Sequence, residues 1–167
     1  MTTVNGTSVG MAHGDRSALQ AILDHHAALA RELDERVAQV LSAAREGVDP
    51  ELGRAALTTF LADELLPHAA AEEQSLYPAA AADPTLESLV LAMIDEHRAL
   101  AHRVDQLDTA LDSTTLVATA AEIRALFAVH LHKENEYLLP AFIHAGVDLP
   151  ALLHDTHHLL AHGQHVR

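Results

Sequence analysis

Four stretches of this 167-residue chain carry apolar residues three and four positions apart, which is the spacing of one face of an α-helix. Each apolar stripe is interrupted near its middle by a histidine, and two stripes are interrupted again by a glutamate four residues later. The interrupting residues are His26, His68, Glu72, His97, His130 and Glu134. We therefore expect an all-α protein with polar groups inside it.

The ends of these stripes are marked by turn and capping residues. Asp49-Pro50 and Asp83-Pro84 are typical helix starts, whereas Gly47 and Gly146 are typical stops. The expected helices span about 15–46, 50–77, 84–111, 113–146 and 150–163. Short links favour antiparallel neighbours, so the pattern predicts an up-down-up-down four-helix bundle with a short additional C-terminal helix.

The same boundaries divide the chain into three parts. Residues 1–14 are expected to form a flexible N-terminal tail, residues 15–146 the bundle, and residues 147–167 a histidine-rich helix and tail. No signal-peptide core and no long uninterrupted apolar run is visible, so we expect a cytoplasmic chain that does not span a membrane.

Composition excludes several classes of function. The chain has no cysteine, which rules out a disulfide framework, a zinc ribbon and thiol catalysis. Its net charge of −14 argues against a nucleic-acid partner. Histidine, the commonest metal ligand, occurs 14 times and outnumbers the 10 lysines and arginines.

Polar side chains within apolar stripes need partners, because an unpaired buried polar group costs about 1–3 kcal/mol. Taken singly, each histidine would more often be a hydrogen-bonded core residue. Together they indicate a metal site, because His68 with Glu72, and His130 with Glu134, are neighbours on one helical face. His26 and His97 add one imidazole each from the remaining two helices.

The fourth stripe contains a competing pair. His132 and Glu136 have the same spacing as His130 and Glu134, but lie about 200° around the helix from the stripe. An internal repeat supports His130, since a proline follows ten residues after both His68 and His130. We therefore expect His130 and Glu134 to point inward.

This combination resembles the hemerythrin-like (HHE cation-binding) domains over roughly residues 15–146. The resemblance implies a non-haem di-iron centre with two iron ions per chain and a solvent-derived oxo or hydroxo bridge. Glu72 and Glu134 would bridge both irons. The terminal ligands would be His26, His68, His97 and His130.

The oxygen-carrying hemerythrins have a fifth histidine where this chain has Ala101. The missing ligand predicts two open coordination positions, and peroxide or nitric oxide chemistry rather than reversible oxygen storage. Tyr77, Tyr137, His25 or a bulged His102 could fill the gap instead.

The function expected from this resemblance is binding of, or reaction with, a small oxidant: oxygen, peroxide or nitric oxide. An iron-handling protein that buffers, senses or donates iron is the alternative, and a purely structural metal site is a third. Ligands of mixed imidazole and carboxylate type without thiolate suit iron, zinc or manganese. The sequence names no protein redox partner.

Three further features have less direct interpretations. The C-terminal segment contains five histidines: His154, His157, His158, His162 and His165. This segment is expected to be a helix that packs on the bundle through its leucines and exposes its histidines to solvent, and a second metal site is the alternative. Glu73 lies off the stripe and is expected to be solvated, or else bonded to a ligand histidine. Pro67 removes one helical hydrogen bond and should kink the second helix.

Overall fold

The computed structural model describes the backbone of residues 13–163 and the side chains of 14–156 and 158–160. Every regular element in this part of the chain is helical, which confirms the predicted all-α class. The α-helices are α1 (His13–Glu46), α2 (Glu51–Phe60), α3 (Leu66–Gln74), α4 (Leu76–Ala81), α5 (Glu87–Asp108), α6 (Ser113–Lys133), α7 (Leu139–Ala145) and α8 (Leu149–Gly163). Two π-helical turns, η1 (Leu61–Leu65) and η2 (Glu134–Leu138), join α2 to α3 and α6 to α7.

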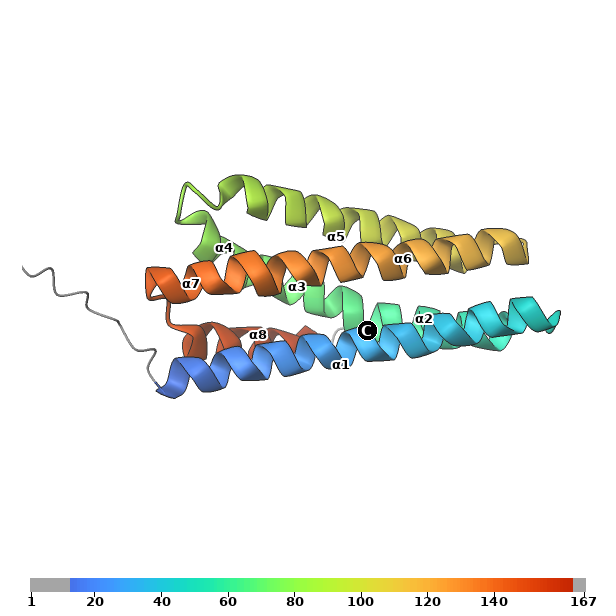
Figure 1. The fold of residues 1–167 in the computed structure, drawn as a ribbon, viewed down its shortest axis with the longest axis horizontal. Helices are drawn as coiled ribbons and strands as arrows, with labels where there is room; N and C mark the ends of the chain where they lie inside the picture. The colour runs from blue at the N-terminus through green and yellow to red at the C-terminus, as the bar shows by residue number, and fades with distance from the viewer. Residues whose placement is uncertain (1–12, 164–167) are drawn as a thin grey trace, which may run out of the picture.

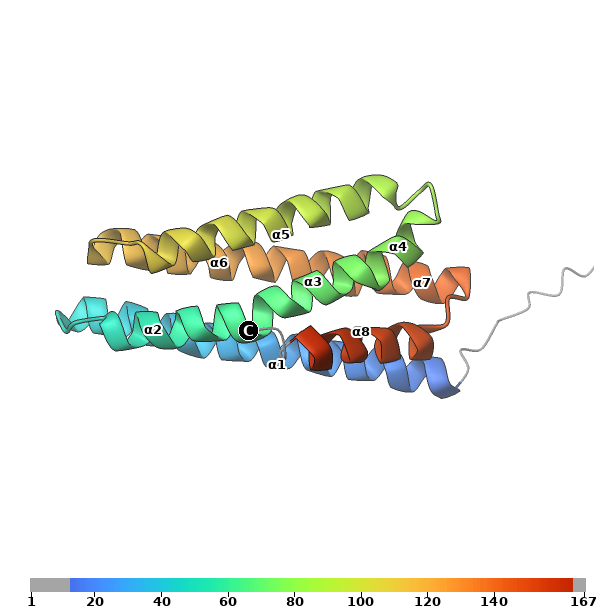
Figure 2. The ribbon, with the colours of Figure 1, turned by 180° about the vertical axis from the view of Figure 1, so that it is seen from behind.

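The helices lie along one long axis and alternate in direction (Figure 1). α1 is followed by the run from α2 to α4 in the opposite sense, then by α5, and finally by the run from α6 to α7. α8 packs along the first half of α1 and against α3, as both ribbon views show (Figure 2). α8 thereby connects α1 with α3.

Most boundaries agree with the capping signals, and two do not. Gly47 and Gly146 end their helices at φ of 66° and 70°, the left-handed region that glycine adopts without strain. Asp83 was expected to cap the third helix, but its side chain accepts hydrogen bonds within a turn from Thr85, and α5 begins at Glu87. The second helix was expected to end at about residue 77, but α4 continues the run to Ala81, with Pro78 in its first turn, where a missing N–H costs little.

Interior prolines coincide with each irregularity in the α2–α4 run and the α6–α7 run. A proline ring cannot donate to the helix and collides with the carbonyl four residues earlier. Pro67 and Pro140 each come two residues after a π-helical turn. In such a turn the backbone hydrogen bonds join residues five apart instead of four. Pro78 follows the break at Ser75, whose φ is −119°. Pro67 was expected to kink its helix, and the irregularity found beside it is the π-helical turn η1.

The interior consists of two apolar clusters with a polar layer between them. One cluster fills the end formed by α2, the second half of α1, and the α5–α6 junction. The other fills the end formed by the start of α1, α4, α7 and the start of α8. The six candidate ligands lie between the two clusters, so apolar side chains cover the polar layer on both sides along the bundle.

Ser113–Ala145 is long and apolar enough to cross a membrane, by length and composition only. The same test is passed by core helices of folded proteins. Here the stretch packs against α1 and α5 and carries the buried His130 and Glu134 on its inner face.

Several expectations concern the ends of the chain. The N-terminal tail lies outside the described residues except for its last two, which belong to α1. His165 and the side chains of His157 and His162 also lie outside the described part. His154 and His158 are exposed on α8, and no candidate metal cluster among the described residues includes them.

Candidate metal centre

The structure brings all six residues of the interrupted stripes into one buried layer. His26 comes from α1, His97 from α5 and His130 from α6. His68 and Glu72 lie one turn apart on α3, and Glu134 is the first residue of η2. Each of the six is at most 5% exposed. By contrast, the competing His132 and Glu136 are exposed.

Glu72 lies at the middle of the layer and divides its two oxygens between two pairs of imidazoles. Its Oε1 is 2.8 Å from His68 Nε2 and 3.5 Å from His26 Nε2. Its Oε2 is 3.6 Å from His97 Nε2 and 4.0 Å from His130 Nε2. A carboxylate placed in this way can bind one metal ion through each oxygen.

Glu134 approaches the same layer from the opposite side. Its Oε2 is 3.6 Å from His26 Nε2 and 3.8 Å from His130 Nε2, so it too lies between the two imidazole pairs. The π-helical turn beginning at Glu134 shifts the following residues relative to a regular α-helix. One result is that Asn135 faces the layer and contacts His26.

The outer nitrogens fix the orientation of three rings. His97 Nδ1 is 2.9 Å from Glu73 Oε1, His130 Nδ1 is 3.2 Å from Glu96 Oε2, and His26 Nδ1 is 2.7 Å from Asn135 Oδ1. Since oxygen accepts at each Nδ1, the N–H of each neutral ring lies there and the inner Nε2 carries a lone pair.

The Glu73 carboxylate is 38% exposed, so the two expectations for this residue are both partly met. It reaches solvent, and it also binds a ligand histidine. Glu96 and Asn135 were not predicted from the sequence. Each of these three residues is adjacent in sequence to a proposed ligand, which is the signal that would have found them.

The donor atoms of the layer fit a cation. His97 Nε2 and His130 Nε2 are 3.1 Å apart, and each carries a lone pair. The nearby hydroxyl of Tyr77 has a single proton, which cannot be donated to both nitrogens at once. Both oxygens of Glu72, both oxygens of Glu134 and both nitrogens of His68 are buried, and none of them makes a contact with the geometry of a hydrogen bond, although His68 Nε2 lies 2.8 Å from Glu72 Oε1. Buried polar atoms in proteins are nearly always paired, so this set indicates a site for metal ions.

The pKa values of the buried groups indicate which of them are charged when no cation is bound. Burial alone would raise the pKa of Glu72, but the nearby imidazoles of His68 and His26 hold it well below its usual value. Burial and the charge of Glu72 raise the pKa of Glu134 well above its usual value. Burial lowers the pKa of His130 to about 4. One carboxylate is therefore charged and the other keeps its proton.

Tyr77, one of the four side chains expected as possible substitutes for the missing histidine, also faces the layer. The hydroxyl of Tyr77, a side chain 2% exposed on α4, is 3.3 Å from His97 Nε2 and 3.4 Å from His130 Nε2. Its ring stacks on that of His97. Burial raises the pKa of Tyr77, and the carboxylates of Glu134 and Glu72 raise it further whenever they are charged, so the hydroxyl is protonated in the metal-free protein. A bound cation would lower this pKa.

Of the four side chains considered for the place of the missing histidine, Tyr77 alone reaches both inner nitrogens of the His97–His130 pair. Tyr137 is 57% exposed. His102 is exposed on the regular helix α5, where it contacts Gln106, so no bulge turns it inward. His25 is half-buried and packs edge-on against His68, with 4.9 Å between ring centroids.

Two cavities lie near the layer. A small one of about 20 Å³ is bounded by His26, His68 and Glu72 and closed from outside by Leu153, Thr156 and Leu160 of α8. It is large enough for about one water molecule. Thr156 also contacts Ser75, 2.8 Å away, which holds α8 against the end of α3.

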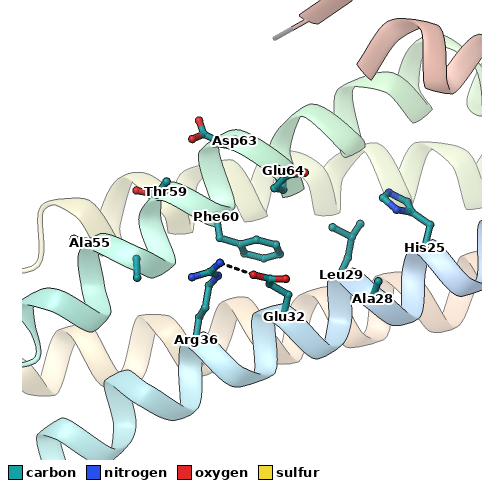
Figure 3. Close-up of a pocket in the computed structure, with 11 residues that line it drawn as sticks. His25, Ala28, Leu29, Glu32, Arg36, Ala55, Thr59, Phe60, Asp63 and Glu64 are labelled. Atoms are coloured by element: carbon teal, nitrogen blue, oxygen red, sulfur yellow. Dashed lines mark hydrogen bonds and ion pairs between the residues drawn. The ribbon is translucent and has the colours of Figure 1, made fainter. Parts of the chain in front are cut away.

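The second cavity is an open pocket of about 560 Å³ between α1 and the α2–η1 run (Figure 3). Arg36 and Glu32 form an ion pair on its floor, and the guanidinium lies over the ring of Phe60. The pocket is lined by His25 but by none of the six candidate ligands. It is therefore separate from the buried layer.

Fold and site together define an all-helical protein with a buried histidine and glutamate cluster that suits metal ions. The model of the family described as "Hemerythrin HHE cation binding domain" matches residues 17–142, and the chain belongs to this family. The match ends before α8. A search of curated proteins and a search of solved structures found no match.

Proposed function

We propose that this chain is a non-haem di-iron protein that binds or reacts with a small oxidant: oxygen, peroxide or nitric oxide. In this proposal α1, the α2–α4 run, α5 and the α6–α7 run form an up-down-up-down four-helix bundle around the centre. The single observation that carries it is the division of the two Glu72 oxygens between two pairs of imidazoles. One carboxylate so placed can serve two cations at once, one through each oxygen.

In the proposed centre His26 and His68 would hold one iron, and His97 and His130 would hold the other. Glu72 and Glu134 would be shared between the two irons, and a solvent-derived oxo or hydroxo bridge is part of the proposal. Imidazole and carboxylate donors without thiolate suit iron. When bound, the two irons would supply electrons to, or accept them from, a small ligand at an open coordination position.

Tyr77 is proposed as a further ligand on the His97–His130 side. Its hydroxyl contacts both inner nitrogens of that pair, so it is placed to occupy one of the two positions that Ala101 leaves open. One open position then remains, on the side of His26 and His68. The cavity of about 20 Å³ on that side suits a ligand of few atoms.

The test is the iron content of the full-length protein after anaerobic loading with iron(II), followed by oxidation and addition of azide. We expect two irons per chain and a new azide-to-iron charge-transfer band. Glu72→Ala should lower both iron content and thermal stability, with exposed Glu136→Ala as the matched control. One iron or none at saturation would contradict the dinuclear proposal.

The alternative proposal, an iron-handling function, uses the same residues. It predicts slow loss of iron to a mild chelator and no charge-transfer band with azide. A purely structural site would show neither behaviour, because all its coordination positions would be filled by the protein.

A further inference from the structure

We infer that the two metal positions are unequal: the position formed by His97 and His130 binds metal more tightly, and the position formed by His26 and His68 is the exchangeable one. This inference rests on the proposed dinuclear function and concerns how that centre loads and releases metal. It follows from the partners of the four outer imidazole nitrogens, which differ between the two positions.

Both imidazoles of the His97–His130 position donate their outer N–H to a carboxylate. Glu73 accepts from His97 at 2.9 Å, and Glu96 accepts from His130 at 3.2 Å. Glu96 is itself ion-paired with Lys133, which fixes its place between α5 and α6. A carboxylate at the outer nitrogen orients the ring and makes its inner nitrogen a stronger donor to metal.

The imidazoles of the His26–His68 position lack such support. His26 donates to the neutral amide oxygen of Asn135 at 2.7 Å, which orients the ring but adds no negative charge. The outer nitrogen of His68 is buried and has no hydrogen-bond partner. Loss of an outer partner typically weakens metal binding about 10- to 100-fold.

The surroundings of the two positions differ in the same sense. Tyr77 adds an oxygen beside His97 and His130. On the other side, the cavity of about 20 Å³ adjoins His26 and His68 and is lined by Leu153, Thr156 and Leu160 of α8. The weaker position therefore also has free space beside it, so metal exchange should begin there.

The experiment is an anaerobic titration of the metal-free, full-length protein with iron(II) against a chromogenic chelator of known affinity. We expect two steps with dissociation constants at least about tenfold apart. Glu73→Gln and Glu96→Gln should each weaken the tight step by about tenfold and leave the weak step nearly unchanged. Asp95→Asn is the matched control. Asp95 is an exposed acid beside Glu96 on α5, and it forms an ion pair with Arg98.

A gain-of-affinity variant tests the other position independently of any loss of folding. Asn135→Asp supplies His26 with the carboxylate it lacks, so the weak step should tighten by about tenfold and the steps should converge. If two irons bind but with equal affinities in the wild type, the inference is wrong. It is also wrong if two irons bind and Glu73→Gln weakens the weak step. Failure to bind a second iron at all would instead contradict the proposed function on which it rests.

Discussion

Acidification of the metal-free protein should reveal the energetic cost of burying His130 in this layer. The side chain is 1% exposed, and burial lowers its pKa from the ordinary value of 6.5 to about 4. The charge of Glu72 and the hydrogen bond to Glu96 act in the opposite direction but do not outweigh burial. The ring is therefore neutral in the folded protein at neutral pH.

The sign of the effect follows from the two pKa values. Between about pH 6.5 and pH 4 the unfolded chain binds a proton at this histidine that the folded chain does not bind. The free energy of unfolding must then fall as the pH falls through this interval. A difference of about 2.5 units, at 1.36 kcal/mol per unit, gives a loss of about 3 kcal/mol from this residue.

The assay is urea unfolding of the metal-free full-length protein at several values from about pH 7 to about pH 4. His130→Gln removes the titrating group, so its free energy of unfolding should lose about 3 kcal/mol less than that of the wild type over this interval. His132→Gln, at an exposed position on the same helix, should behave like the wild type. Equal pH dependence of wild type and His130→Gln would refute the reasoning.

Three further predictions concern the metal-loaded protein. His130→Ala should abolish binding of at least one iron, whereas His132→Ala should leave iron content and melting temperature nearly unchanged; the reverse result would move the centre to Glu136. Tyr77→Phe should remove any phenolate-to-iron(III) absorption and strengthen azide binding, and an unchanged spectrum would exclude Tyr77 as a ligand. Because the raised pKa of Glu134 keeps a proton on it, Glu134→Gln should release about one proton fewer per chain on loading near pH 6, as measured with an indicator dye.

The helices and the buried polar layer were predictable because both follow from helical periodicity. A histidine or glutamate that interrupts an apolar stripe must point inward wherever the stripe does, as His68 and Glu72 do. The same argument separated His130 from His132, which have identical local motifs but opposite exposure. Spacing along one helix was sufficient for these residues.

The π-helical turns and the true start of α5 were less predictable. Pro67 indicated a disturbed helix, but not that the disturbance would be a π-helical turn before it. Asp83-Pro84 has the sequence of a helix start, yet the Asp83 side chain is used within a tight turn with Thr85. In both cases a local motif allows two backbone solutions, and packing between helices selects one.

Two of the three outer partners, Glu96 and Asn135, were missed for a different reason, and the orientation of Glu73 was left open between solvent and a ligand histidine. Glu73, Glu96 and Asn135 flank ligands in sequence, and so lie at the edge of a stripe, where a side chain can turn either to solvent or to the next helix. Which way each turns depends on the helix packed beside it. That information is not contained in the periodicity of a single helix.

Tyr77 changes the interpretation of the gap at Ala101. Two six-coordinate irons have twelve positions, of which four imidazoles, two bridging carboxylates and a solvent bridge would fill ten. A phenol oxygen beside His97 and His130 would fill an eleventh, the same number that a fifth histidine would fill. The departure at Ala101 then alters the kind of ligand rather than the number of open positions. A phenolate carries charge that an imidazole does not, so it would stabilise the oxidised metal and favour turnover of an oxidant over its reversible storage.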